Sequence, residues 1–247
     1  LIDKKNQKTF LIKDSFGKKP LYFFKKNNKI FFASEIKAIK QLIKLEVSKE
    51  NLHINMACHL LPPPLSLYKD LNSVMPSSFL EINSEYLIRE QRWYFPKFST
   101  IKKFCEDDFI NLFKDSIKIR TRSDVPLSIY LSGGLDSMLI TEFVRKNNKY
   151  IAPLTANIES KGEWENNNTD VINQTKYCKQ FNLENHSTVI NYEYWNNNIL
   201  EIINNYEEIF VDSGNLIFYA LGKLAKENNF KVVLAGNGGD ELFGGYP

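Results

Sequence analysis

A short apolar stretch that breaks into a glycine turn and resumes as a helix constrains this chain more than any other feature. The apolar run at 125–131 leads into SGGLDS at 132–137, and a helical pattern continues from 138 to 146. Such a turn leaves backbone N–H groups unpaired at the start of the helix, where they can hold phosphate oxygens. The turn therefore predicts an anion-binding loop.

The same alternation of strand and helix continues through the second half of the chain. Strands separated by helices of this length imply right-handed crossovers and a mostly parallel sheet covered on both faces. The first of the helices carries an apolar stripe made of Phe109, Leu112, Phe113 and Ile117. The expected helices are 107–121, 138–147, 171–181 and 216–227, and the expected strands are 125–131, 151–158, 186–190 and 231–235.

The first ninety-odd residues alternate short apolar runs with turn-forming clusters, which is typical of a β-rich region. Ser34 is expected to cap a short helix that carries Ile36, Ile39 and Ile43 on one side. The expected strands are 9–12, 21–24 and 30–33, followed by a hairpin of 78–82 with 86–88.

A domain boundary is expected where the periodic patterns stop. Around 96–103 the composition turns to Lys, Ser and Thr without periodicity. Segments of this kind connect domains in which few contacts cross the boundary. We therefore place a linker at 97–106 between a first domain at 1–96 and a second at 107–247.

A second glycine cluster follows the last expected strand, where 231–235 runs into GNGGDELFGG at 236–245. In an open parallel sheet, ligands bind beyond the carboxyl ends of the strands, so two such loops can face one crevice. Two glycine turns with two aspartates suit a nucleoside triphosphate with magnesium, because glycine permits close approach to phosphate and carboxylates take part of the metal's shell. Either loop alone is more often a plain tight turn, and Asp136 alone could be a helix N-terminal carboxylate.

The bulk composition excludes several classes of partner. The net charge of +3 comes from basic residues spread along the chain, so no nucleic-acid surface is expected. Cys58, Cys105 and Cys178 lie far apart without metal-ligand spacing, which indicates idle, semi-buried thiols. The asparagine-rich stretches at 166–168 and 196–198 are expected to be connections. No stretch reaches the length of a membrane span and no signal peptide opens the chain, so a cytoplasmic location without membrane contact is expected.

Four segments, taken together, resemble those of the asparagine synthetase B family. SGGLDS, preceded by RSDVP at 122–126, resembles its pyrophosphate-binding loop, and 236–246 resembles its GxGxDELFGGY signature. KDSFGKKPLY at 13–22 and FASEIKA at 32–38 are similar to the RDRFGxKPLYY and FASEIKAL segments of its glutaminase domain. Because the four segments occur in the right order across the whole chain, chance is a poor explanation.

The resemblance implies an α/β protein with two parts: a partial class II glutaminase domain (Ntn-type, β-rich) and a parallel-sheet ATP-pyrophosphatase domain that is adenine nucleotide alpha hydrolase-like. In that family, one domain frees ammonia from glutamine. The other uses ATP and Mg²⁺ to adenylate a carboxylate, and ammonia then displaces AMP. The implied substrates are ATP, glutamine and a carboxylate, most simply aspartate, and the resemblance allows a homodimer.

The resemblance also assigns roles to residues. It places phosphate around the loop and adenosine at its flanks, with two magnesium ligands. Glu241 is left open between a functional role and a loop-capping one. The phosphate-binding residues would be Ser132, Gly133, Gly134 and Ser137, the adenosine pocket would be lined by Leu131, Ala156 and Gly236, and the metal ligands would be Asp136 and Asp240.

Several departures bear on activity. The family commonly has an acidic residue where this chain has Asn237, which cannot act as a general acid or base. The family's PPGH stretch corresponds best to MPSS at 75–78. Its nucleophile is an N-terminal cysteine, whereas this chain begins at Leu1, has no initiating Met and stops just after a glycine loop. We therefore expect a fragment that is itself inactive and assign it no catalytic residue.

Two alternatives stay open at this point. One is an amidotransferase that acts on another carboxylate, such as a cell-envelope sugar acid. The other is a non-catalytic ATP-binding paralogue, which Asn237 favours slightly and the intact Asp136 and Asp240 oppose. No catalytic role is assigned to the three histidines, which lack a nucleophile or ligand partner at meaningful spacing: His53, His59 and His186.

Overall fold

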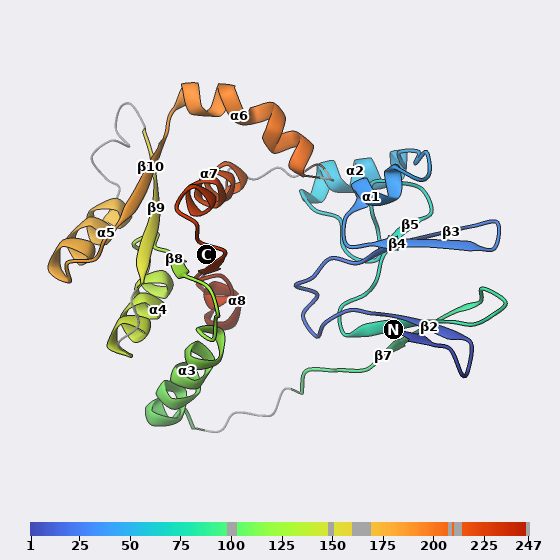
Figure 1. The fold of residues 1–247 in the computed structure, drawn as a ribbon, viewed down its shortest axis with the longest axis horizontal. Helices are drawn as coiled ribbons and strands as arrows, with labels where there is room; N and C mark the ends of the chain where they lie inside the picture. The colour runs from blue at the N-terminus through green and yellow to red at the C-terminus, as the bar shows by residue number, and fades with distance from the viewer. Residues whose placement is uncertain (98–102, 148–150, 160–168, 207–208, 210–213, 246–247) are drawn as a thin grey trace. The chain divides into compact units, whose positions relative to one another are not determined.

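The computed structural model describes residues 1–97, 103–147, 151–159, 169–206, 209 and 214–245 (Figure 1). The chain divides into two compact units. The first comprises Leu1–Thr100 and Ile203–Asp212, and the second comprises Ile101–Ile202 and Ser213–Pro247. The linker and the domain bounds expected from the sequence stay a prediction, because residues 98–102 lie outside the described residues.

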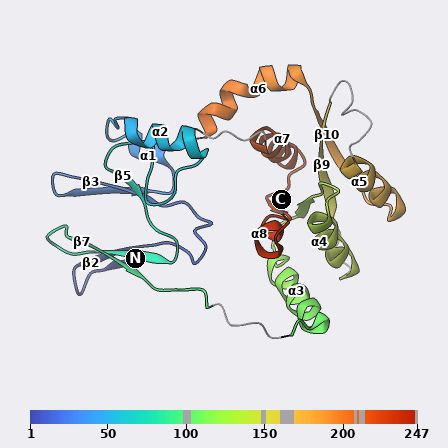
Figure 2. The same ribbon diagram turned by 180° about the vertical axis from the view of Figure 1, so that it is seen from behind.

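The first unit is β-rich, as predicted, and is built from two antiparallel sheets (Figure 2). Leu11 and Leu80 are buried and pack with Phe23 and Ile30, so side chains of the two sheets share one core. One sheet has the order β1-β2-β6-β7, with β1 at Ile2–Asp3, β2 at Lys8–Ile12, β6 at Ser78–Ile82 and β7 at Ile88–Arg92. The other has the order β4-β3-β5, with β4 at Lys29–Ala33, β3 at Tyr22–Lys26 and β5 at Leu71–Ser73.

Two short helices complete this unit. Helix α1 (Ile36–Lys40) buries Ile36 and Ile39 against the β4-β3-β5 sheet. The expected cap at Ser34 is wrong, because Glu35 is the extended residue before the helix and no side chain caps it. Helix α2 (Lys49–Cys58) does have a side-chain cap, since Ser48 accepts a hydrogen bond from the backbone N–H of Asn51.

The second unit contains the expected parallel sheet, with strand order β10-β9-β8-β11. Helices α3, α4 and α5 contribute to the clusters on one side of the central strands, and α7 contributes to the other (Figure 1). The strands are β8 (Leu127–Tyr130), β9 (Ala152–Ile158), β10 (His186–Ile190) and β11 (Val232–Leu234). The helices are α3 (Glu106–Arg120), α4 (Leu135–Lys146), α5 (Thr169–Gln180), α6 (Tyr192–Asn205), α7 (Gly214–Glu227) and α8 (Gly239–Phe243). The last residues of α6, from Ile203 on, belong to the first unit.

Two local expectations for this unit are wrong, and a third falls on residues that the structure does not describe. The 196–198 stretch lies inside α6, because Asn198 satisfies its amide by donating to the Tyr194 carbonyl and is buried there. Leu112 is 72% exposed, because the inward stripe of α3 follows Phe109, Phe113 and Ile117 at four-residue spacing. The 166–168 stretch lies outside the described residues.

Two further expectations from the sequence concern the burial of the cysteines and the presence of membrane-spanning helices. Cys58 and Cys105 are exposed, contrary to the expected semi-burial, and only Cys178 is buried. Burial raises the pKa of the Cys178 thiol. Within the described residues, no helix is both long and apolar enough to cross a membrane.

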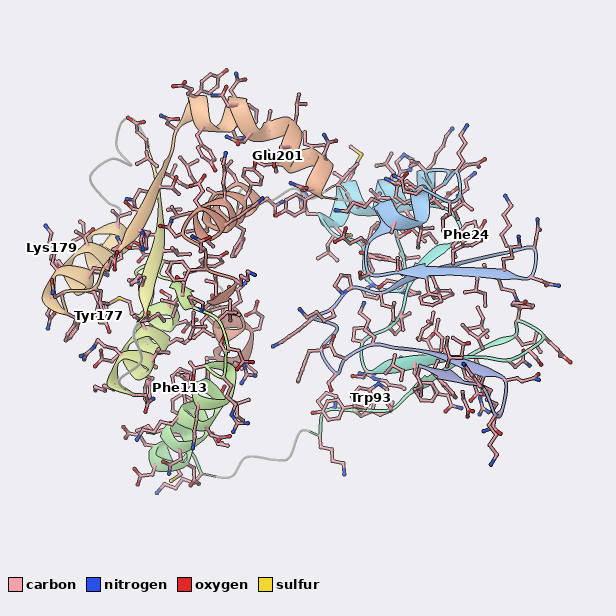
Figure 3. All side chains as sticks on the ribbon, in the orientation of Figure 1. Phe24, Trp93, Phe113, Tyr177, Lys179 and Glu201 are labelled. Atoms are coloured by element: carbon pink, nitrogen blue, oxygen red, sulfur yellow. The ribbon has the colours of Figure 1, made fainter. Side chains whose placement is uncertain are left out.

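A network of hydrogen bonds joins α4 to α5, the helix that carries Tyr177 (Figure 3). The Tyr177 hydroxyl donates to a Glu142 carboxylate oxygen at 2.7 Å, and Arg145 donates to both Glu142 oxygens at 2.8 and 2.9 Å. These hydrogen bonds, chiefly those from Arg145, lower the pKa of Glu142 from 4.5 to about 2. Because α4 begins at the SGGLDS turn, this network fixes the helix that carries Asp136.

The network predicts a pH-dependent stability. The folded-state pKa of Glu142 lies below its ordinary value, so its contribution is complete above pH 4.5 and is lost as the pH falls toward about 2. Glu142→Gln should therefore flatten the fall in the urea midpoint between pH 5 and pH 3. Tyr177→Phe should lower the free energy of unfolding by roughly 1.5 kcal/mol at neutral pH, since the charged partner is one-quarter exposed. Equal slopes for wild type and Glu142→Gln would contradict the role of this carboxylate.

Candidate functional site

The two glycine loops leave the carboxyl ends of neighbouring strands. Strands β8 and β11 are parallel, with Leu127 opposite Val232 and Ile129 opposite Leu234. A Cβ atom placed on Gly236 would lie 3.1 Å from the Cβ of Asp136 and 3.1 Å from the Ser137 nitrogen. The loops are therefore in direct contact, although about a hundred residues separate them in the sequence.

The first loop is shaped by its own hydroxyl groups. The Ser132 N–H donates to the Ser137 hydroxyl at 3.2 Å, and the two hydroxyl oxygens lie 2.9 Å apart. The Gly134 N–H donates to the Ser132 hydroxyl, while the Ser137 hydroxyl donates to the Gly134 carbonyl. Ser137 is buried and Ser132 is exposed, so Ser137 holds the loop's shape and Ser132 is the hydroxyl that a ligand can reach.

Helix α4 starts three residues earlier than the periodicity predicted. Its N-cap is Gly134, which has no side chain to bond the first-turn N–H groups. Asp136 therefore lies in the first turn, where the helix dipole favours a carboxylate. The uncapped start gives the loop the donor pattern that binds phosphate oxygens.

A third element, helix α5, lies against the loop at Gly133 and Gly134. Gly133 has a φ of +93°, and a Cβ on it would overlap the backbone carbonyl of Asp170 in α5. A Cβ on Gly134 would lie 4.0 Å from an Asp170 carboxylate oxygen. Sequence reasoning missed Asp170, because only the folding of α5 onto the β8 turn brings this residue to the loop.

The two expected metal ligands come from the two loops. A Cβ on Gly239 would overlap the Asp136 carboxylate, so this carboxylate lies against the residue that precedes Asp240. Among the described residues, no group of three or more His, Cys, Asp and Glu side chains could hold a metal. The donor set fits a magnesium ion that takes its remaining ligands from nucleotide phosphates and water, which is how this ion is usually held.

The expected adenosine-pocket residues lie deeper in the sheet. The Leu131 side chain is 1% exposed and packs with Tyr177 and Cys178, so only its backbone can reach a ligand. Ala156 packs against the cluster formed by Leu154 and α7. Gly236 follows the end of β11 and lies against Asp136 and the Ser137 nitrogen.

Comparison with known protein families settles the assignment of the chain. Residues 108–247 match the family described as Asparagine synthase, and residues 1–94 match the Glutamine amidotransferase domain. The chain belongs to the asparagine synthase family. The resemblance seen in the four sequence segments and the expected fold class are thereby confirmed.

Two curated relatives are similar over nearly the whole chain. Asparagine synthetase (glutamine-hydrolyzing) 1 of Bacillus subtilis is 30% identical over 240 residues, which cover 95% of this chain and 37% of that protein. A provisionally named asparagine synthetase (glutamine-hydrolyzing) 2 of Methanocaldococcus jannaschii is 30% identical over 262 residues, covering 100% of this chain and 48% of the relative. The chain thus spans less than half the length of these family members.

Solved structures show a more distant likeness. The NH3-dependent NAD synthetase from Campylobacter jejuni is 18% identical, with a TM-score of 0.35 over 57% of this chain and 58% of that one. The glutamine-dependent NAD+ synthetase from Acinetobacter baumannii is 12% identical, with a TM-score of 0.38 over 91% of this chain and 52% of that one.

Asn237, where the resemblance predicts an acidic residue, lies in the second loop and is exposed. Helix α8 begins two residues later and carries Asp240 and Glu241 in its first turn. An amide at this position keeps hydrogen-bonding capacity and loses both the negative charge and the ability to take a proton.

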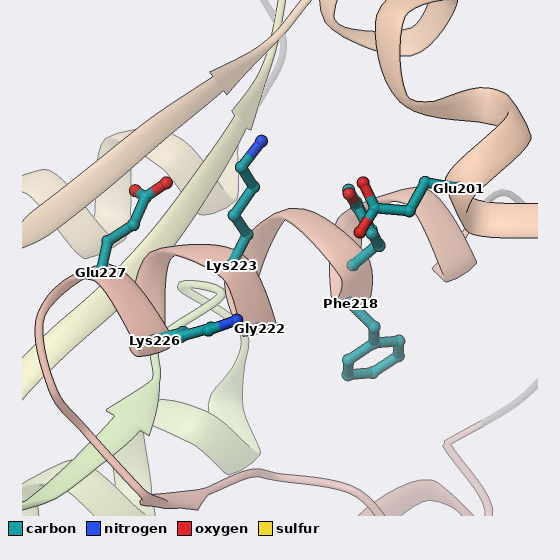
Figure 4. A pocket seen from close by; sticks show the side chains of 7 residues that line it. Glu201, Phe218, Gly222, Lys223, Lys226 and Glu227 are labelled. Carbon is teal, nitrogen blue, oxygen red and sulfur yellow. The ribbon is translucent and has the colours of Figure 1, made fainter. Parts of the chain in front are cut away.

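A separate pocket of about 600 Å³ lies between α6 and α7 (Figure 4). None of its lining residues belongs to either glycine loop: Glu201, Phe218, Tyr219, Gly222, Lys223, Lys226 and Glu227. A hydrogen bond with Glu201 is the main cause that raises the pKa of Tyr219 to about 12. The charges that line this pocket are mixed, so they favour no single class of ligand.

Proposed function

We propose that this chain is part of an ATP-dependent amidotransferase that converts aspartate to asparagine, using ammonia from glutamine and releasing AMP and pyrophosphate. One observation carries the proposal: the Asp136 carboxylate of the first loop lies against Gly239 of the second, beside Asp240. Phosphate donors and carboxylate ligands for a metal are thus together at the carboxyl ends of adjacent parallel strands.

The loop residues have distinct roles in this proposal. The first-turn N–H groups of α4 and the exposed Ser132 hydroxyl donate to the phosphate oxygens of ATP. Ser137 and Gly133 keep the loop in that shape, and Gly236 lets the second loop approach the nucleotide. Asp136 and Asp240 would hold magnesium, which neutralises charge on the departing pyrophosphate when it is bound.

The first unit supports the use of glutamine, because residues 1–94 match the Glutamine amidotransferase domain. The names of the relatives in Bacillus subtilis and Methanocaldococcus jannaschii support asparagine as the product. We assign no nucleophile for glutamine hydrolysis within the described residues. Cys58 and Cys105 are internal, so neither can use its own α-amino group as the base.

Asn237 supports a second candidate function. If an acidic group at this position assists amide formation, its replacement by an amide favours a different acceptor, such as a sugar carboxylate, or a paralogue that only binds ATP. The presence of both Asp136 and Asp240 argues for retained ATP chemistry.

Exchange of labelled pyrophosphate into ATP by the full-length protein tests these candidates. Adenylation of a carboxylate is reversible, so exchange that depends on aspartate and Mg²⁺ is the expected result. Exchange that requires a hexuronic acid instead would replace aspartate as the acceptor. ATP binding without exchange for any carboxylate would leave only the ATP-binding paralogue.

A further inference from the structure

The glycines of the second loop differ in which atoms lie near the position that a Cβ atom would occupy. At Gly238 a Cβ would have no neighbour within 4 Å, and at Gly236 it would press on the Ser137 backbone nitrogen at 3.1 Å. At Gly239 and Gly245 the nearest atoms are carboxylate oxygens. These two glycines therefore face the side chains that the proposed function assigns to magnesium.

Gly239 lies against Asp136. The three atoms nearest to its ideal Cβ position are both oxygens and the Cγ of the Asp136 carboxylate. The carboxylate thus occupies the volume that any other residue at 239 would fill. Asp136 is half-buried, so the contact defines one side of the space in which its carboxylate sits.

Gly245 lies against Asp240 in the same way. Its ideal Cβ would overlap an Asp240 carboxylate oxygen, and the Asp240 Cα would be 3.3 Å away. The N–H groups of Gly244 and Gly245 both donate to the Asp240 carbonyl, at 2.8 and 3.2 Å. The end of α8 therefore folds back onto Asp240 and brings Gly245 against its carboxylate.

We infer that Gly239 and Gly245 are positioning residues for magnesium: each provides the space in which one metal-binding carboxylate lies. This inference rests on the proposed Mg·ATP site. It assigns the two glycines a role that is separate from contact with the nucleotide, because they act through Asp136 and Asp240.

An alanine at either position should displace a carboxylate and leave the fold intact. The obstructing atoms lie at the end of a short side chain that can rotate about its χ1 angle, whereas at Gly133 the obstruction is backbone. A displaced carboxylate keeps its charge but loses the geometry that magnesium demands. Residues that orient a metal ligand typically change metal affinity 10–100-fold when they are replaced.

The experiment is a magnesium titration of ATP binding to the full chain. For Gly239→Ala and Gly245→Ala, we expect the Mg²⁺ concentration at half-saturation to rise at least about tenfold. ATP binding in EDTA and the melting temperature should stay within error of wild type. Gly222→Ala is the matched control, because its added methyl meets no atom within 4 Å and should leave the magnesium dependence unchanged.

A double-mutant cycle separates positioning from a general structural effect. If Gly239 acts through Asp136, then Gly239→Ala should have no further effect on the magnesium dependence in an Asp136→Asn background. An equal effect in both backgrounds, or equal losses with Mg²⁺ and with EDTA, would overturn the inference. If wild type binds no ATP at any Mg²⁺ concentration, the proposed function itself fails.

Discussion

Mg·ATP should raise the melting temperature of the wild-type chain, and Asp136→Ala should abolish the increase. A ligand present at a hundred times its dissociation constant stabilises the folded state by about 2.7 kcal/mol. For a chain of this size that corresponds to an increase of about 5–10 °C. The Asp136 carboxylate lies between the first-turn backbone of α4 and Gly239 of the second loop. In the proposed site, its removal would leave the magnesium ion without a ligand from the first loop.

Control variants separate loss of the metal from a general loss of charge. Asp115→Ala removes an exposed carboxylate from α3, outside both loops, and should keep the full increase. Asp240→Ala should resemble Asp136→Ala. An Asp136→Ala protein that is still stabilised by Mg·ATP, or a wild type that is not stabilised at all, would contradict the assignment of this site.

Much of the second unit could be predicted because local pattern and tertiary structure agree there. The strand 186–190 was predicted at its exact bounds, since its apolar residues and its flanking turns are both local signals. The meeting of the two loops also followed from topology, because parallel strands place their carboxyl ends on one edge of the sheet. The strand is specified over a short stretch of sequence, whereas the meeting of the two loops, about a hundred residues apart, follows from the parallel order of the strands.

The remaining differences come from interactions that short sequence windows do not contain. Helix α6 was missed because asparagine has a low helix propensity, so Asn196 and Asn197 weaken the helical pattern. The buried amide of Asn198 is satisfied by hydrogen bonds with Tyr194 and Tyr219, which the sequence does not reveal. Asp170 was missed because its position at Gly133 depends on how α5 crosses the end of β8. The N-cap position of α1 is Glu35 and not the expected Ser34, and a difference of one residue is within the usual uncertainty of a helix end.

Gly133→Ala should be the most damaging single methyl addition in the nucleotide loop. The position combines a φ of +93°, which side chains with a Cβ rarely adopt, with a backbone carbonyl of Asp170 in the space that the methyl would need. A left-handed conformation alone costs a non-glycine residue about 1–2 kcal/mol, and the backbone of α5 cannot rotate away as a side chain can. We expect the free energy of unfolding to fall by about 2–3 kcal/mol, together with loss of the stabilisation by Mg·ATP.

The same substitution at Gly222 should raise the free energy of unfolding, whereas at Gly133 it should lower it. Gly222 lies in α7, where an added Cβ would meet nothing within 4 Å, so alanine only reduces the freedom of the unfolded chain. Gly222→Ala should therefore raise the free energy of unfolding by about 0.5–1 kcal/mol in urea titrations. If Gly133→Ala proved as stable as Gly222→Ala, the contact between α5 and the loop would be wrong, and Asp170 would have no place beside the phosphates. A loss at Gly133 larger than the about 1–2 kcal/mol that a left-handed conformation costs would instead show that the contact with α5 shapes the loop. That contact joins SGGLDS to the rest of the second unit.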